Sequence, residues 1–223
     1  MKASLIFQSL VGLVMAVPAA DSADALVARQ SVVTGKYCSP ITQLCYNEYT
    51  TQGGSTFRVA VSDAAAGTTF DIAVQLLAPA GQGWVGLSFG GSMTYAPLAV
   101  GWPNGQSVTG TVRWANGHTM PTVYSGATLK ILPDSGTNGT HYMLSAICTG
   151  CSSFPRSGSG TKTLNPSGTF RAAWAQNIQR GSVAQPANPA SNFNYHQYFN
   201  YFDADLGSAK VPAAQFQAAA ALA

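Results

Sequence analysis

In Thr56-Phe57-Arg58-Val59-Ala60-Val61-Ser62, large apolar side chains alternate with Arg58 and Ala60. In Phe70-Asp71-Ile72-Ala73-Val74-Gln75-Leu76, they alternate with Asp71, Ala73 and Gln75. Successive side chains of a β-strand point to opposite faces of its sheet, so an apolar residue at every second position predicts a strand buried on one face. Both stretches therefore predict half-buried strands.

The same alternation extends over the rest of the chain. Further members are Val108, Val112 and Trp114; Leu129 and Ile131; Tyr142, Leu144 and Ala146; and Phe170, Ala172 and Trp174. Turn signals rich in Gly, Pro and Asn separate these runs at roughly the 8–12-residue spacing of all-β sandwiches. No long apolar period of 3.6 residues occurs in this part of the chain, which argues against a parallel α/β fold. The sequence predicts an all-β fold of two packed antiparallel sheets.

The ends of the chain predict a secreted protein with one domain. Residues 1–20 hold one Lys, a short apolar run and small residues suited to cleavage, as in a secretory signal peptide. We expect a short leader or propeptide at 21–36, the folded domain at 37–206 and an Ala-rich tail at 207–223 that is disordered or a frayed helix. Asn138 begins an N-glycosylation sequon in a Gly-rich loop, which fits an extracellular surface.

Composition narrows the class of function. Charged residues make up 9% of the chain. Removing Lys2 leaves ten Lys and Arg against eight Asp and Glu, a formal net charge of about +2. That charge is too small for a nucleic-acid binder, and after the signal peptide no apolar run is long enough to span a membrane. We expect a soluble extracellular monomer.

The four cysteines predict two local disulfides rather than a metal site. Cys38, Cys45, Cys148 and Cys151 are even in number in a chain expected to be secreted, where thiols oxidise. Cys148 and Cys151 also have the spacing of a covalent haem attachment site, but such a site needs His directly after the second Cys, and position 152 is Ser. Any haem here would be of the non-covalent b type.

Met93 and His196 are the strongest candidate metal ligands. Met93 ends the glycine bend Gly90-Gly91-Ser92-Met93, which directly follows an apolar run. A thioether on such a bend is poorly explained as core filler, and well explained as a ligand for a soft metal such as haem iron. His196 lies in the aromatic tract at 192–202, which is suited to wall a flat apolar cofactor. Met with His is a ligand set of electron-transfer haem.

The remaining ligand types are less favoured. The full set is His118, His141, His196, Met93, Met120 and Met143. His141 and Met143 alternate on one predicted strand, so they share a face and cannot approach a ring from opposite sides. His118 follows the hairpin signal Asn116-Gly117 and is interpreted as an exposed turn residue, and Met120 is expected to pack. With both axial positions of the iron filled, the site would pass electrons and bind no substrate at the metal.

Several motifs in order carry a family resemblance. They are Trp84-Val85-Gly86-Leu87-Ser88-Phe89-Gly90-Gly91-Ser92-Met93, Val100-Gly101-Trp102-Pro103-Asn104-Gly105, Val112-Arg113-Trp114-Ala115-Asn116-Gly117, Thr140-His141-Tyr142 and Cys148-Thr149-Gly150-Cys151. Over about 37–206 the chain resembles the secreted fungal cytochrome domain of cellobiose dehydrogenase. The resemblance implies an immunoglobulin-like sandwich, haem b held by Met93 and His196, and a disulfide between Cys148 and Cys151.

The resemblance also implies redox partners, and at one position this chain differs from the family pattern. The family shuttles electrons from a flavin dehydrogenase to copper-dependent lytic polysaccharide monooxygenases or other one-electron acceptors, here in trans. Where it leads us to expect a tyrosine near a haem propionate, this chain has His118, a third ligand-capable residue near the pocket. We further predict Trp84, Trp102, Tyr195 and Phe199 as pocket walls. No catalytic residue is assigned.

Two other classes of function compete with this interpretation. Gly86-Leu87-Ser88-Phe89-Gly90 matches the G-x-S-x-G motif of hydrolases, but no helix is predicted after Ser88, as a nucleophile elbow requires. Asp203 and Asp205, which lie beside the aromatic tract, are interpreted as loop or turn-cap residues, not as a glycosidase pair. The more serious alternative is a haemless carbohydrate-binding sandwich in which Tyr195, Tyr198, Tyr201 or Trp102 stacks on sugars.

Overall fold

The computed structural model describes residues 33–223. The predicted signal peptide and the leader up to residue 32 lie outside the described residues. Residues 33–36, predicted as the end of the leader, instead form the first part of β1, Val33–Cys38. They pair with β2, Cys45–Thr50, because Cys38 lies opposite Cys45 and the hairpin register continues outward from there. The fold therefore begins earlier than the sequence predicted.

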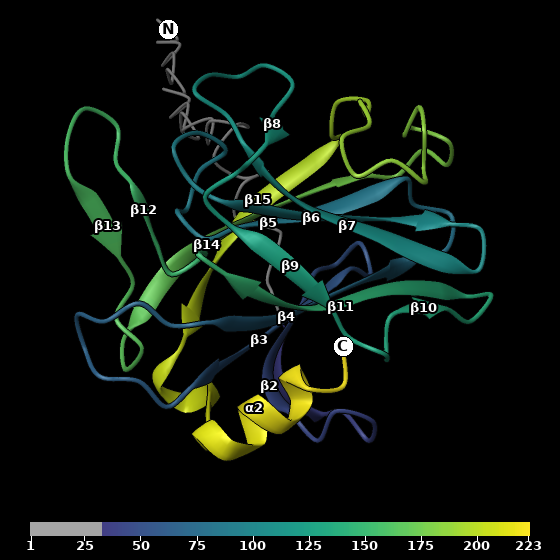
Figure 1. Cartoon of the computed structure of the whole chain (residues 1–223). Coiled ribbons are helices and arrows are strands. Elements are labelled where there is room, and N and C mark those ends of the chain that lie inside the picture. The colour runs from purple at the N-terminus through teal and green to yellow at the C-terminus, as the bar shows by residue number, and fades with distance from the viewer. Residues whose placement is uncertain (1–32) are drawn as a thin grey trace, which may run out of the picture. The chain divides into compact units, whose positions relative to one another are not determined.

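Two packed antiparallel sheets form the domain, which confirms the predicted fold class (Figure 1). The first sheet, sheet A, follows the order β1, β2, β3 (Thr56–Ser62), β4 (Ile72–Pro79), β11 (His141–Thr149) and β10 (Gly136–Thr137), with β16 (Lys210–Val211) beside β3 and β9 (Thr128–Ile131) beside β11. The second sheet, sheet B, follows the order β15 (Tyr198–Asp205), β14 (Thr169–Asn177), β5 (Trp84–Ser88), β6 (Leu98–Asn104), β7 (Ser107–Trp114) and β8 (Thr122–Val123). A separate hairpin pairs β12 (Ser153–Pro155) with β13 (Thr161–Thr163). The β16–β3 pair is parallel.

The main core lies between the two sheets. The alternating residues that the sequence placed on one face, Phe57 and Val59 among them, are buried there. They meet Leu87, Phe170 and Trp174 from sheet B, and the rings of Phe57 and Trp174 lie 6.0 Å apart. The hydrophobic burial that stabilises the sandwich therefore comes from the period-two pattern.

The outer face of sheet A is also buried, so its strands are not half-buried as predicted. Ala60 and Ala73 on this face pack with Phe216 and Ala219 of α2, Ala213–Ala220. The tail at 207–223 was predicted to be disordered or a frayed helix; in the structure it is ordered, and η1, Gly207–Ala209, leads through β16 into the helix α2. The run of alanines favours a helix, and residues three apart lie on one helical face, so Phe216 and Ala219 cover the sheet together.

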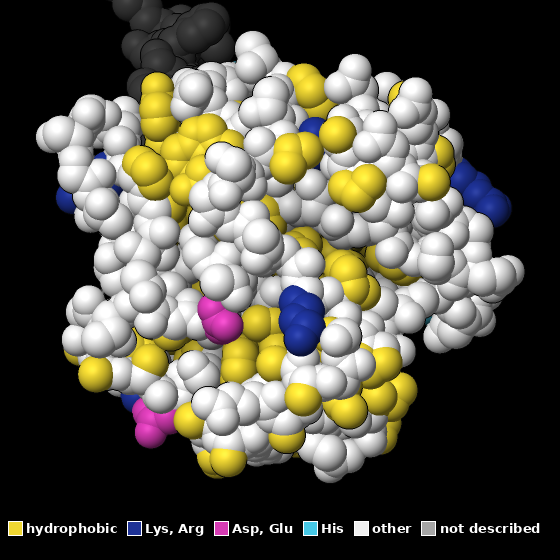
Figure 2. Space-filling view, in the orientation of Figure 1, with side chains coloured by type: hydrophobic (Ala, Val, Ile, Leu, Met, Phe, Trp, Pro, Cys, Tyr) yellow, Lys and Arg dark blue, Asp and Glu magenta, His cyan; other side chains and the backbone are white. Residues whose placement is uncertain are grey.

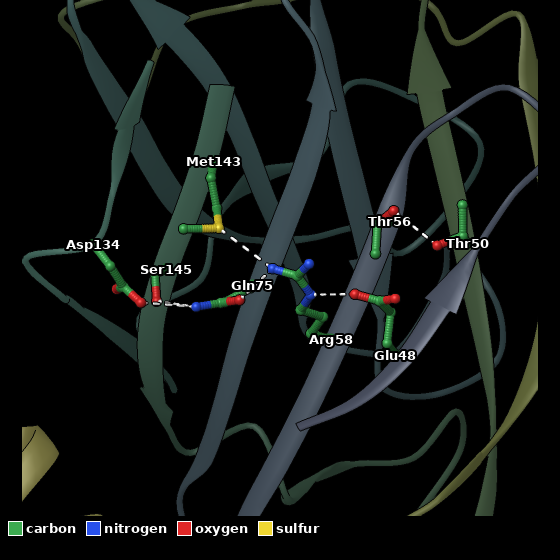
Figure 3. Close-up of polar contacts among 8 residues, drawn as sticks. All are labelled: Glu48, Thr50, Thr56, Arg58, Gln75, Asp134, Met143 and Ser145. Atoms are coloured by element: carbon green, nitrogen blue, oxygen red, sulfur yellow. Dashed lines mark hydrogen bonds and ion pairs between the residues drawn. The ribbon is translucent and has the colours of Figure 1, made fainter. Parts of the chain in front are cut away.

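A chain of polar contacts crosses this covered face (Figure 3). Glu48 pairs with Arg58 at 2.7 Å, and the Arg58 guanidinium donates to the amide oxygen of Gln75 at 2.8 Å. The Gln75 amide nitrogen in turn donates to Asp134 at 2.9 Å and to Ser145 at 3.2 Å. Gln75 and Ser145 are fully buried. These contacts satisfy polar groups that would otherwise be costly to bury.

Two local disulfides, Cys38–Cys45 and Cys148–Cys151, are present, and the described residues contain no free cysteine. The prediction of two local bridges is confirmed. Charged side chains are sparse on the face seen in Figure 2, as the composition leads one to expect. No helix among residues 33–223 is long and apolar enough to cross a membrane.

Candidate functional site

A cavity of about 390 Å³ lies on the outer face of sheet B. Its floor is made of strand residues that point away from the main core, and several are small: Gly86 and Ser88 on β5, Leu98 and Val100 on β6, and Ala173 and Ala175 on β14. Three connecting segments close it. We call them the Met93 bend (residues 89–97), the His118 loop (115–121) and the strap (178–197). Figure 1 shows the strap as yellow-green loops beside sheet B.

The Met93 bend is fixed by close backbone contacts. Gly91 has a φ of +79°, in the left-handed region that favours glycine. A Cβ there would lie 2.9 Å from the carbonyl oxygen of Arg171, so only glycine lets the bend approach β14 this closely. The Ser88 hydroxyl donates to the carbonyl of Ser92 at 2.5 Å. Met93 is left half-buried at the cavity wall.

The strap carries His196 to the same cavity. Its backbone is held by sheet B: the Trp84 indole N–H donates to the carbonyl of Asn194 at 2.9 Å, and the Asn177 amide donates to that of Tyr195 at 2.6 Å. The His196 ring stacks on Tyr195 at 4.2 Å and meets Phe199 edge-on at 5.2 Å. The sequence placed Met93 and His196 in loops far apart in the chain, and the structure brings both to one cavity.

The chemistry of His196 suits a metal ligand. The ring is half-buried, and its Nδ1 atom is buried with no hydrogen-bond partner in the described part of the chain. Burial lowers the pKa of His196 because it penalises the imidazolium form. The imidazole therefore keeps a free lone pair at neutral pH.

Most of the other predicted site residues also line the cavity. Trp84, Tyr195, Phe199 and His118 do so, and the His118 side chain is exposed. Trp102, predicted as a wall, does not: it lies one layer behind Phe193, with ring centres 6.0 Å apart, and its indole N–H donates to the carbonyl of Pro186 at 2.8 Å. Trp102 shares the outer face of β6 with Val100, but there the strap buries it completely.

Sequence reasoning missed other lining residues. Phe193, Met120 and Tyr201 all border the cavity. Phe193 belongs to the aromatic tract already singled out, so its signal was present. Met120 was interpreted as a packing residue, yet the residue is 41% exposed. His141 and Met143 lie on sheet A and do not border the cavity.

Ser88 is not placed as the nucleophile of a hydrolase would be. Ser88 lies in β5 and its hydroxyl is bound to the Met93 bend, with no helix following. Among the described residues that line the cavity there is no Asp, Glu, Lys or Arg. Nor do residues 33–223 hold a cluster of three His, Cys, Asp or Glu side chains that could bind a metal ion. The cavity offers apolar and aromatic walls, two thioethers (Met93 and Met120) and two imidazoles (His118 and His196).

The comparison with protein families identifies the domain. A family model described as the cytochrome domain of cellobiose dehydrogenase matches residues 37–217. The chain belongs to this family. The resemblance seen in the ordered sequence motifs is thereby confirmed.

Solved structures show the same fold. The cytochrome b domain of pyranose dehydrogenase from Coprinopsis cinerea superposes with a TM-score of 0.73 at 26% identity, covering 85% of this chain and 96% of that one. The cytochrome domain of cellobiose dehydrogenase from Myriococcum thermophilum gives a TM-score of 0.71 at 27% identity, with the same coverage of 85% and 96%.

A curated relative is a much longer protein. The pyrroloquinoline quinone-dependent pyranose dehydrogenase of Coprinopsis cinerea is 34% identical over 132 residues, which is 59% of this chain and 18% of that enzyme. The matched stretch therefore spans less than a fifth of that dehydrogenase.

Proposed function

We propose that this chain is a secreted electron-transfer protein that carries one haem b between Met93 and His196. The observation that carries the proposal is the cavity itself: two loops distant in sequence bring a thioether and a neutral imidazole to one apolar space. The buried Nδ1 of His196, without a partner among the described residues, marks a ring that accepts a further ligand. A structural relative is named a cytochrome b domain, which supports the b type.

The residues present fit a flat apolar group with a metal at its centre. Trp84, Phe193 and Phe199 supply aromatic walls, and the small floor residues leave room between them. Haem iron moves one electron at a time between its ferric and ferrous forms. Met93 and His196 would hold the iron, and a thioether ligand favours the ferrous form. Apolar walls around the iron would act in the same direction by disfavouring the extra positive charge of ferric iron.

The proposed donor is a flavin dehydrogenase or a similar oxidoreductase, and the proposed acceptor is a one-electron acceptor such as a lytic polysaccharide monooxygenase. Support comes from the relatives, which are named as dehydrogenases or as cytochrome domains of dehydrogenases. The predicted signal peptide supports secretion. The His118 side chain, exposed at the cavity, is the proposed neighbour of a haem propionate in place of a tyrosine.

The test is the visible spectrum of the protein loaded with haemin, oxidised and then reduced with dithionite. We expect a low-spin haem spectrum for the wild type, a high-spin spectrum for Met93→Ala, and loss of haem for His196→Ala. Met120→Ala and His118→Ala are matched controls, because both residues border the same cavity and carry the same donor types.

The controls make the outcome specific. If Met120→Ala or His118→Ala removes the low-spin spectrum while Met93→Ala keeps it, the ligand assignment is wrong. A wild-type protein that takes up no haem would contradict the proposed function. The carbohydrate-binding alternative would then be tested by sugar titrations against Tyr195→Ala and Tyr201→Ala, since both rings are exposed.

A further inference from the structure

Arg113 is a buried cation that the sequence pattern placed on a half-exposed strand. It lies on β7 and is 2% exposed. The ion pairs found in residues 33–223 are Glu48 with Arg58 and Asp63 with Lys210, so no carboxylate of the described chain neutralises Arg113. Burying an unpaired charge is costly, which means that the protein gains something from this guanidinium.

The guanidinium donates only to backbone carbonyls. One terminal nitrogen donates to Pro121 at 3.1 Å, and the other donates to Pro189 at 2.6 Å and to Ser191 at 2.7 Å. These carbonyls belong to irregular segments and take no part in a sheet ladder. The planar guanidinium has five N–H groups in a fixed fork, so one Arg satisfies acceptors that lie in different directions.

The three carbonyls come from the two segments that carry the cavity's imidazoles. Pro121 ends the His118 loop and itself borders the cavity. Pro189 and Ser191 lie in the strap, shortly before Phe193 and His196. Both segments accept hydrogen bonds from the same Arg113 side chain. Arg113 therefore fixes the distance between the His118 loop and the strap, and with it the position of His196 at the cavity.

The charge also lies close to the cavity. The guanidinium carbon is 5.3 Å from the ring centre of Phe193, whose side chain lines the cavity wall. A guanidinium stays protonated in proteins. A positive charge behind the wall disfavours ferric iron, which carries one more positive charge than ferrous iron, and it acts through a low-dielectric layer with little screening.

We propose that Arg113 is a positioning residue of the haem site: it ties the His118 loop to the strap, and its uncompensated charge raises the reduction potential. This proposal rests on the proposed function for its second half. The first half concerns the protein without haem and stands on the hydrogen bonds alone.

The matched comparison is between Arg113→Met, Arg113→Lys and Arg171→Met. Arg171 is a suitable control because its guanidinium lies over a cavity-lining ring, that of Tyr201, at 4.5 Å, yet the residue is exposed. Both Met variants remove one positive charge that lies against an aromatic ring of the cavity wall, Phe193 for Arg113 and Tyr201 for Arg171. Only Arg113→Met also removes the ties between the two segments.

Two measurements separate the halves of the proposal. The first is amide hydrogen exchange of the haem-free protein, where we expect Arg113→Met to speed exchange at least about tenfold in both the His118 loop and the strap, for the loss of several charge-assisted hydrogen bonds. Arg113→Lys should speed it less, because an ammonium cannot reach all three carbonyls, and Arg171→Met should leave both segments unchanged. Acceleration in one segment only, or in neither, would overturn the positioning role.

The second measurement is the midpoint potential of the haem-loaded protein. Arg113→Met should lower it by more than Arg171→Met, because the exposed charge is screened by water. Arg113→Lys keeps the charge and should recover most of the difference. Equal shifts in the two Met variants, or no recovery with Lys, would overturn the electrostatic role. If Arg113→Met does not fold, Arg113→Lys still decides the loop contacts. If the wild type binds no haem, the proposed function is wrong, but the exchange measurement on the haem-free protein still tests the positioning role.

Discussion

Replacing Gly91 with alanine probes how the Met93 bend is held against sheet B. The backbone there has a φ of +79°, which an L-residue with a Cβ adopts at a cost of about 1–2 kcal/mol. The new methyl group would also stand 2.9 Å from the carbonyl oxygen of Arg171 and 3.5 Å from its Cβ. The neighbour is backbone of a central strand, so it cannot move aside as a flexible side chain would.

Gly105 supplies a control with the same backbone strain and no contact. It lies in the turn between β6 and β7 with a φ of +62°, and a Cβ there would meet nothing within 4 Å. Gly105→Ala should therefore lower the free energy of unfolding only by the cost of the left-handed backbone conformation, about 1–2 kcal/mol. Gly91→Ala should lower the free energy of unfolding by that amount and by about 1–3 kcal/mol more, because the new methyl group is overpacked against Arg171. The difference between the two variants isolates the contact between the bend and Arg171.

The assay is urea unfolding of the haem-free protein, followed by tryptophan fluorescence. Each kcal/mol of lost stability corresponds to about 2–4 °C in Tm for a domain of this size, so thermal melts check the same ranking. Equal losses of unfolding free energy in Gly91→Ala and Gly105→Ala would refute the argument, since the close approach would then carry no energy. In the haem-loaded protein we further expect Gly91→Ala to mix high-spin character into the spectrum, because the displaced bend carries Met93.

Three other outcomes test the rest of the fold. Glu48→Gln, which breaks the shielded pair with Arg58, should lower the free energy of unfolding by about 2 kcal/mol, whereas Asp63→Asn at an exposed pair should cost less than about 1 kcal/mol, both measured by urea unfolding. Burial, with a smaller effect of the Asp134 charge, raises the pKa of Tyr46 from 10.0 to about 12. Between those pH values the unfolded chain has lost a proton that the folded chain keeps, so stability should fall by up to about 2.7 kcal/mol as the pH rises, and Tyr46→Phe should flatten that part of the profile. Trp102→Phe should speed amide exchange in the strap without moving the haem spectrum, because Trp102 lies behind the wall.

The sandwich was predictable because its signal is local. Strands such as β3 and β4 show their inner face through a period of two residues, and turn residues mark where each strand ends. What the pattern could not show is the covering of the outer faces. Ala60 and Ala73 read as the exposed side of their strands, yet a helix more than a hundred residues later packs on them through Phe216. No local period encodes that contact.

For the candidate site, too, some features could be predicted from local sequence and others could not. Met93 and His196 stood out because their residue types and local surroundings are unusual wherever the chain places them. Nothing in the local sequence indicates whether the strap buries a residue. Trp102 resembled a wall because it is aromatic and lies near the motif, and Arg113 resembled a surface charge because it alternates with apolar neighbours. Both are buried by strap residues 76 or more positions away, as their hydrogen bonds show.

The hydrogen bonds that hold the strap explain how an irregular segment can fix the position of His196. An unpaired carbonyl buried against a sheet is costly, so each needs a donor. Side chains projecting from sheet B supply these donors to the strap carbonyls: Trp84 to Asn194, Trp102 and Thr109 to Pro186, Arg113 to Pro189 and Ser191, and Asn177 to Tyr195. These hydrogen bonds hold the strap to the sheet on both sides of Phe193. His196 is therefore held by the sheet in the haem-free protein, which would reduce the ordering cost of binding the proposed haem.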